Sequence, residues 1–446
     1  MTTPIADFVK KYANTDTSRF HMPGHKGKSF LGCEALDITE ISGADVLGSA
    51  SGIIAQSEAN ATALFGSGHS FYSTEGSSLA IKAMLTLIKK KSPAGQRVRI
   101  LAARNAHKAL IYACALLDID VDWLYPKEFT HLCACIISAD ELDATLSGGD
   151  TLPSAVYVTS PDYLGNVADI RGLAEVCHKH GLPLLVDNAH GAYLAFKEPS
   201  EHPLALGADM CCDSAHKTLP VLTGGAYLHI SKEYRHFSVE EIRNTLSVFA
   251  STSPSYLTLQ SLDMCNAYIA NGYGARLAEF IKKLRSLKKK LALLGFPCND
   301  TEDLKIVFSK IKCGYSGTEL AKHLSDFGIE IEFADPDYAV LMVTPENSDS
   351  DLARIYDAFC VLKPRAAYNN ATPTLPALPR RRMSIREAIF SNSEIIEAKD
   401  SEGRICAATT VSCPPAVPIV VSGEVINSNA IELMRYYEIE KIDVIK

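Results

Sequence analysis

The sequence lacks any excess of positive charge. Lysine and arginine together number 44 against 52 aspartate and glutamate residues, which leaves a formal net charge of −8 at pH 7. A chain without a basic field is not expected to bind nucleic acid or an anionic membrane surface. Small molecules, including cationic ones, are therefore the expected ligands.

Long hydrophobic runs are also missing. The first 20 residues contain no apolar stretch of the kind that a secretory signal peptide requires. The two longest uncharged stretches, 244–262 and 405–423, are rich in serine and threonine and contain prolines, so neither has the character of a membrane-spanning helix. We expect a cytoplasmic protein with no membrane partner.

Clustered metal ligands are scarce. The 13 cysteines are scattered, and the closest of them, Cys133 with Cys135 and Cys211 with Cys212, do not form the Cys-x-x-Cys pairs of structural zinc sites. We predict free thiols, most of them buried or inert, and no metal site.

The composition that remains is that of a globular protein. The chain has 446 residues, of which 47% are hydrophobic and 22% charged, enough for two or three domains. Turn signals, proline spacing and hydrophobic patterning predict five consecutive parts. They are an N-terminal arm over 1–55, a large domain over 56–300, a small α+β domain over 301–365, a proline-rich linker over 366–379 and a C-terminal α+β segment over 380–446.

The predicted large domain alternates helices and strands. Ser78–Lys90 has helical spacing, and short apolar runs of strand length recur through the domain. These runs are Val98–Ala102, Ala155–Thr159, Leu182–Val186, Met210–Cys212 and Gly225–Ile230. Such alternation predicts an α/β fold with a mainly parallel sheet, whose ligands bind outside the carboxyl ends of the strands.

The region that follows is predicted to be a helix and a smaller sheet. An amphipathic pattern over Tyr268–Leu294 ends at Gly295 and indicates one long helix. The runs Leu304–Phe308, Glu330–Phe333 and Val340–Val343 have the length and composition of strands.

Two reactive residues follow neighbouring apolar runs. Asp187 comes at the end of one predicted strand, and Lys217 follows the next run 30 residues later. Pyridoxal phosphate (PLP) chemistry needs a lysine that forms a Schiff base with the cofactor. It also needs an acid that keeps the ring nitrogen protonated. The pair therefore indicates a PLP site.

Two further features match such a site, although each has an ordinary structural explanation. The segment Ser73–Ser78 places hydroxyl groups and backbone N–H groups at a helix N-terminus, which suits a phosphate but also describes an ordinary helix cap. His107 follows a predicted strand and could cover a flat ring, or could be a structural histidine.

Several motifs along nearly the whole chain resemble the ornithine/lysine/arginine decarboxylase family of PLP fold type I. They are Phe20–Gly27, Asp187–Tyr193, Ser214–Pro220, Thr223–Ala226, Ser251–Tyr256, Cys413-Pro414-Pro415 and Gly423-Glu424. The resemblance implies a PLP-dependent transferase-like large domain with a seven-stranded-type sheet and a smaller C-terminal domain. Within the family, the chain resembles the short branch, whose members have no N-terminal wing domain.

The resemblance also implies a role for each matching residue. Lys217 would form the Schiff base, Asp187 would bind the ring nitrogen, His107 would stack on the ring and His190 would lie beside its phenolic oxygen. The phosphate would be surrounded by Gly76, Ser77, Ser78, Ser214 and His216. Thr252 or Ser253 would reach it from a partner subunit, in a homodimer or higher oligomer with active sites at the interface. Lys217 or His216 would return a proton to the substrate.

The implied activity is decarboxylation of a basic L-amino acid, namely arginine, lysine or ornithine, to the amine and CO2. The distal cation of such a substrate needs an acidic partner. Candidates are Glu75, Asp162, Glu424 and the carboxylates of 21–45; family members often have asparagine at position 75 and threonine at position 162. Alternatives are another fold type I activity, such as an aminotransferase or carbon–sulfur lyase, and a catalytically silent PLP-fold protein that binds a partner.

Overall fold

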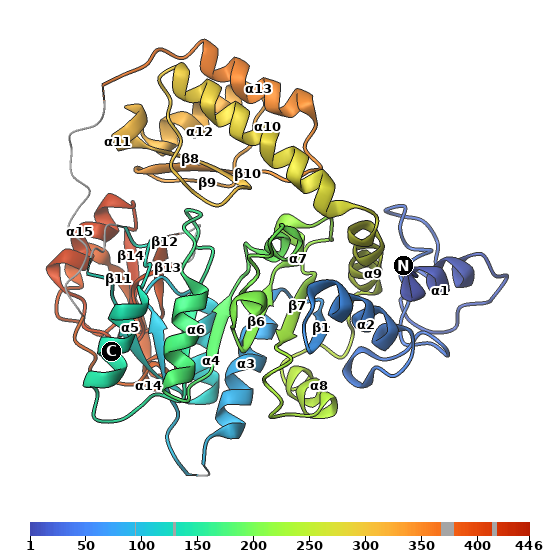
Figure 1. Cartoon of the computed structure of the whole chain (residues 1–446). Helices are drawn as coiled ribbons and strands as arrows, with labels where there is room; N and C mark the ends of the chain where they lie inside the picture. Colours follow the sequence, from blue (N-terminus) through green and yellow to red (C-terminus); the bar gives the residue numbers. More distant parts are fainter. Residues whose placement is uncertain (94, 128–130, 367–378, 413–416) are drawn as a thin grey trace. The chain divides into compact units, whose positions relative to one another are not determined.

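The structure of the chain is a computed structural model that forms two compact units (Figure 1). It describes all residues except 94, 128–130, 367–378 and 413–416, so most of the predicted linker and the motif Cys413-Pro414-Pro415 lie outside the described residues. The first unit comprises 1–96, 154–158 and 170–275. The second comprises 97–153, 159–169 and 276–446. Among the described residues, no helix is long and apolar enough to cross a membrane.

A seven-stranded sheet has the order β1-β7-β6-β5-β4-β2-β3. Its strands are β1 (His69–Ser73), β2 (Arg99–Ala103), β3 (Asp120–Leu124), β4 (Ala155–Thr159), β5 (Leu184–Asp187), β6 (Met210–Asp213) and β7 (Ala226–Ile230). The sheet is mixed and mainly parallel, with β7 antiparallel to both β6 and β1. This confirms the predicted fold class. The five predicted strands are present within two residues, whereas β1 and β3 were missed because polar residues interrupt their apolar runs.

Helices of the first unit connect and cover its strands. They are α1 (Pro4–Ala13), α2 (Ile53–Phe65), α3 (Ser77–Lys91), α6 (Ile170–Lys179), α7 (Ala215–Thr218), α8 (Val239–Ser247) and α9 (Tyr256–Ala270). The predicted arm thus contains a helix that the sequence analysis did not identify. Ile5, Ala6 and Val9 of α1 are fully buried, and the Asp263 carboxylate of α9 accepts hydrogen bonds from the N–H groups of Ile5 and Ala6, each at 2.9 Å. Burial and this cap explain why α1 forms.

The predicted long helix is divided in two. Asn271 and Gly272 separate α9 from α10 (Tyr273–Leu293), and Gly272 has a φ of +79° that a helix cannot accommodate. The prediction of a single helix over 268–294 is therefore wrong at its first residues, which belong to α9.

The second unit holds the remaining elements, and Figure 1 shows α10 and α12 lying over its three-stranded sheet. Its further helices are α4 (Lys108–Leu117), α5 (Ala139–Gly148), α11 (Lys310–Cys313), α12 (Gly317–Asp326), α13 (Asp349–Cys360), α14 (Ile385–Phe390) and α15 (Ser428–Tyr436). Its further strands are β8 (Lys305–Ser309), β9 (Phe333–Ala334), β10 (Tyr338–Met342), β11 (Ser393–Glu397), β12 (Thr410–Ser412), β13 (Val417–Val420) and β14 (Lys441–Ile445). The predicted strand Glu330–Phe333 is wrong except at Phe333, where pairing with Val340 begins.

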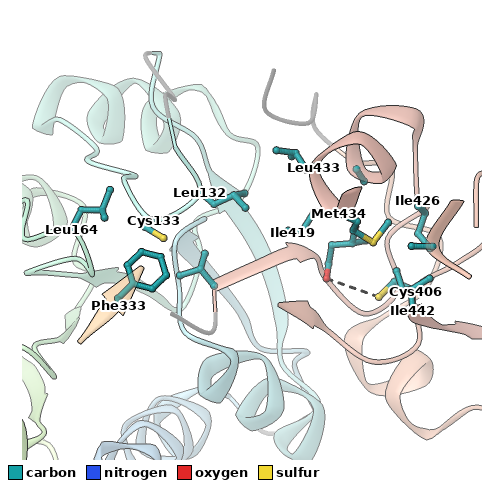
Figure 2. Packing of buried hydrophobic residues seen from close by; sticks show 14 of the residues in the cluster. Leu132, Cys133, Leu164, Phe333, Cys406, Ile419, Ile426, Leu433, Met434 and Ile442 are labelled. Carbon is teal, nitrogen blue, oxygen red and sulfur yellow. Dashed lines mark hydrogen bonds between the residues drawn. The ribbon is translucent and has the colours of Figure 1, made fainter. Parts of the chain in front are cut away.

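One hydrophobic cluster in the second unit joins side chains that are far apart in the sequence. Figure 2 shows Leu132, Cys133, Leu164 and Phe333 on one side and the C-terminal residues Ile419 and Met434 on the other, all of them buried. Removing such apolar surface from water is the main stabilising contribution to this unit.

A buried ion pair ties the C-terminal segment into the same unit. The Arg104 guanidinium is 3% exposed, and it donates to the carbonyls of Pro418 at 2.8 Å and Ile419 at 3.1 Å. Its Nη2 also lies 3.6 Å from Glu424 Oε2. Burial raises the pKa of Glu424, and the neighbouring Arg104 guanidinium opposes this rise.

We expect Arg104→Ala to destabilise the protein by about 3–5 kcal/mol, because it leaves Glu424 as an unpaired buried charge and two carbonyls without donors. Urea unfolding followed by circular dichroism measures the difference. Arg285→Ala is the matched control: Arg285 is 66% exposed and pairs with Asp303, so its loss should change stability by no more than about 0.5 kcal/mol. Equal effects of the two substitutions would contradict the expectation.

Candidate functional site

Asp187 is the last residue of β5 and is 2% exposed. Its Oδ2 accepts a hydrogen bond from the Tyr157 hydroxyl at 3.1 Å, and its Oδ1 accepts from the Ala189 N–H at 3.2 Å. The Cys212 thiol of β6 donates to Oδ1 at 3.6 Å. A carboxylate held by three donors has a defined orientation, which is what a partner for a ring nitrogen requires.

Lys217 lies in the short helix α7, four residues after β6 ends. Its Nζ is 3.0 Å from Nε2 of His190, which is 4% exposed and lies in the turn directly after β5. The structure thus brings Lys217 together with His190, and places Asp187 at the carboxyl end of the neighbouring parallel strand in the same unit. Asp187 and Lys217 thus lie at neighbouring strand ends as predicted, and their binding to one ligand stays a prediction.

The predicted phosphate loop opens the 15-residue helix α3. Ser214 Oγ donates to Ser77 Oγ at 2.9 Å, so the first residue of α3 and the residue before α7 are in contact. Gly76 has a φ of +73°, and a Cβ there would have no neighbour within 4 Å, so the loop faces open space. Hydroxyl groups and the first N–H groups of a helix around open space suit a phosphate group.

Two glycines hold this loop in place. The Gly76 N–H donates to the Gly224 carbonyl at 2.7 Å, and a Cβ on Gly224 would lie 2.7 Å from the carbonyl oxygen of Thr74. His216 is fixed nearby, with its Nδ1 3.0 Å from the Gly225 carbonyl. The motif Thr223–Ala226 therefore packs against the loop before α3 and fixes its position.

Thr252, Ser253 and His107 are the other predicted site residues. Thr252 and Ser253 are exposed and follow Ser251, whose N–H donates to Glu75 Oε1 at 2.6 Å. Their contact with a partner's phosphate stays a prediction. His107 belongs to the second unit, where its Nδ1 accepts from the Ala109 N–H at 3.1 Å and caps α4. Its stacking on a ring also stays a prediction.

Several candidates for binding the substrate's distal cation are engaged within the protein. Asp162 is fully buried and accepts from the Asn166 N–H at 2.9 Å and from Asn166 Nδ2 at 2.7 Å; burial raises the pKa of its carboxyl to about 6. Glu424 is paired with Arg104. Among the acids of the arm, Glu34 caps backbone N–H groups, Asp37 pairs with His25, and Asp45 also caps backbone N–H groups. The candidates Glu40 and Glu75 are exposed.

The cysteines behave mostly as predicted. All those that the structure describes are free thiols, most are buried, and Cys360 is exposed. Burial raises the pKa of Cys135 to about 11 and that of Cys177 to about 12, which keeps both protonated and unreactive.

No local sequence pattern indicates the role of Tyr157 or the surroundings of Asp213. Tyr157 lies inside a correctly predicted strand, but no local pattern indicates that its hydroxyl reaches Asp187. Asp213 directly precedes the motif Ser214–Pro220, yet its partners His202 and His229 come from other segments and have no sequence spacing that would link them.

Known proteins are similar to this chain along nearly its whole length. The family model for the Orn/Lys/Arg decarboxylase major domain matches residues 3–312, and the model for the C-terminal domain of the same family matches 365–442. The arginine decarboxylase of Bacillus subtilis is 30% identical, over 96% of this chain and 92% of the relative. That of Halalkalibacterium halodurans is 28% identical, over 97% of this chain and 93% of the relative.

Solved structures show the same fold. The constitutive lysine decarboxylase of E. coli aligns with a TM-score of 0.78 at 17% identity and covers 100% of this chain and 82% of its own. The Francisella novicida lysine decarboxylase aligns with a TM-score of 0.82 at 16% identity and covers 100% of this chain and 81% of its own.

The fold, with an aspartate and a lysine after adjacent strands, is that of the fold type I class of PLP-dependent enzymes. The chain belongs to the Orn/Lys/Arg decarboxylase family, whose activity is the decarboxylation of basic amino acids. Aminotransferase and carbon–sulfur lyase activities, the alternatives considered from the sequence, are not the activity of this family.

Proposed function

We propose that the protein binds PLP and decarboxylates L-arginine to the corresponding amine and CO2. The observation that carries the proposal is the placement of Asp187 and Lys217 after adjacent strands in a chain of this family. Arginine is preferred to lysine and ornithine because curated relatives at 27–30% identity are arginine decarboxylases. The lysine decarboxylases are similar at only 16–17% identity, which bears on the fold alone.

The residues of the first unit fit PLP in three respects. The open loop at Gly76 with Ser77 and Ser214 suits the phosphate, the Asp187 carboxylate suits a protonated ring nitrogen, and the Lys217 amine suits the aldehyde. When bound, PLP accepts the electron pair that is released as the bond between Cα and the carboxylate breaks.

The residues of the chain have distinct tasks in this proposal. Asp187, oriented by Tyr157 and Ala189, stabilises positive charge at the ring nitrogen. Lys217 Nζ, beside His190 Nε2, delivers the proton that replaces the departing carboxylate, so that one proton is taken up for each CO2 released. We assign this proton to Lys217 rather than His216, because the His216 ring is held by the Gly225 carbonyl.

The distal guanidinium requires an acid, and we propose Glu40 or Glu75 for this role. Both are exposed and both lie next to the segment 251–252: Glu75 through its hydrogen bond to Ser251, and Glu40 by lining one cavity of about 240 Å³ together with Thr252. A carboxylate can bind guanidinium through two parallel hydrogen bonds.

We further propose a homodimer or higher oligomer in which residues 252–253 and the arm complete the partner's site, and in which His107 covers the ring. Exposed large hydrophobic side chains of the arm support this: Phe20 is 96% exposed, Phe30 78% and Leu31 89%. Apolar side chains gathered on one segment are typical of a surface that another chain covers.

Incubation of the PLP-loaded protein with arginine, lysine, ornithine and aspartate tests the function. We expect CO2 and amine in equal amounts, identified by mass spectrometry, with the highest kcat/KM for arginine. Light scattering on the same sample gives the oligomeric state. Bound cofactor without CO2 release from any basic amino acid would contradict the proposal, and transfer of the amino group to an added 2-oxo acid would favour an aminotransferase.

A further inference from the structure

A buried cluster of polar side chains around Asp213 contacts the turn that follows β5. Asp213, the last residue of β6, is fully buried and comes four residues before Lys217. Its Oδ1 accepts a hydrogen bond from Asn188 Nδ2 at 2.7 Å, and Asn188 is also fully buried. Asn188 directly follows Asp187, so this bond joins the ends of the two strands that carry the site.

Two histidines face the other oxygen of Asp213. His202 Nε2 lies 3.1 Å from Asp213 Oδ2, and His229 Nε2 lies 3.3 Å from the same atom. His229 is held in turn by Ser70 Oγ, 2.7 Å from its Nδ1. Burial raises the pKa of Asp213, but the two histidines outweigh burial and hold it well below its usual range. The carboxylate is therefore ionised and fixed from both sides.

The turn that Asp213 holds carries groups of the proposed PLP site. The Ala189 N–H donates to Asp187 Oδ1, and His190 Nε2 meets Lys217 Nζ at 3.0 Å. The turn closes with the Gly191 N–H donating to the Asn188 carbonyl at 2.8 Å. A change at Asn188 would thus displace both the donor to Asp187 and the partner of Lys217.

We propose that Asp213 is a positioning residue for the decarboxylation: through Asn188 it sets the turn that orients Asp187 and His190. The inference rests on the proposed function. It adds a residue that touches neither substrate nor cofactor and acts through a single side-chain contact. Displacement of reacting groups by about 1 Å can slow an enzyme by about 100-fold. The hydrogen bond between Asp213 and Asn188 is therefore expected to affect kcat.

The same cluster offers metal-ligating atoms, since donors of His202, Cys211 and Asp213 all lie within 4.8 Å of one another. Hydrogen bonding accounts for the geometry, because His202 Nε2 forms a hydrogen bond to Asp213 at 3.1 Å. Burial also raises the pKa of the Cys211 thiol well above its usual value, which disfavours the thiolate that a metal ion would need.

The test compares Asn188→Ala, which removes only the link, with Asp213→Asn, which keeps an acceptor for Asn188 but loses the charge. We expect Asn188→Ala to lower kcat by about 10- to 100-fold with KM changed less than about 3-fold. The pH midpoint of the visible absorbance of bound PLP should shift, and PLP should dissociate faster during dialysis. Asp213→Asn should shift the same midpoint in the same direction.

Asp209→Asn is the control, because Asp209 is a carboxylate of the same unit that binds the Leu184 N–H and His178 at the opposite end of β5 and β6 instead of the turn. It should leave the absorbance midpoint unchanged. An equal shift in Asp209→Asn, no shift in Asn188→Ala, or one equivalent of zinc in the wild type that Cys211→Ser abolishes would each overturn the inference. Failure of the wild type to bind PLP would instead refute the proposed function, so the two failures are distinguishable.

Discussion

Lys217→Ala is expected to lose decarboxylase activity by about 10²- to 10⁴-fold or more, because it removes both the covalent anchor of PLP and the proposed proton donor. Lys217 Nζ lies 3.0 Å from His190 Nε2. An alanine methyl group can neither bond to the cofactor aldehyde nor exchange a proton with His190. The visible absorbance of lysine-bound PLP should vanish with the activity.

Borohydride reduction followed by mass spectrometry measures this directly. The wild type should gain the mass of one reduced PLP on the peptide that contains Lys217, and the variant should gain none. Lys232→Ala is the control, since Lys232 is an exposed lysine of the same unit and should label and react like the wild type. Retention of label and turnover in Lys217→Ala would remove the basis of the proposed mechanism.

Asp187→Asn is expected to lower kcat by about 10²- to 10³-fold while PLP remains bound. The amide has nearly the shape of the carboxylate but cannot balance a positive charge on the ring nitrogen. The site can accommodate the change, because the Tyr157 hydroxyl, now 3.1 Å from Oδ2, can accept a hydrogen bond as well as donate one. Single-turnover kinetics would show the loss in the chemical step.

A carboxylate at the opposite end of the same pair of strands provides the control. Asp209 precedes β6, accepts from the Leu184 N–H at 2.8 Å and pairs with His178 at 3.0 Å. Asp209→Asn removes a carboxylate of similar setting without touching the site, so its kcat should stay within about twofold of the wild type. Similar losses in both variants would mean that kcat reports general loosening of the sheet.

Local sequence patterns predict the strands that are mostly apolar, such as β4, β5 and β7, because a strand buried on both faces needs a nearly continuous apolar run. The same patterns do not predict β1. Its first two residues, His69 and Ser70, are polar, although four of the five positions of the strand are buried. The patterns also fail at Gly272, where one residue with positive φ ends a helix inside an otherwise continuous amphipathic pattern. A sequence pattern reflects only the residue types along the chain. Strand pairing and backbone conformation depend also on the residues that pack nearby in space.

The sequence by itself determined the class of site. Asp187 ends one apolar run and Lys217 follows the next, and the carboxyl ends of parallel strands lie at one edge of the sheet, so their placement on neighbouring strands follows from local pattern and chain direction. Only the tertiary structure decided which other groups serve that site. It engaged Asp162 with Asn166 and Glu424 with Arg104, and it placed Asp213 between two histidines from distant segments. Burial and pairing of charge are properties of the packed interior, and nothing in the spacing of these residues along the chain encodes them.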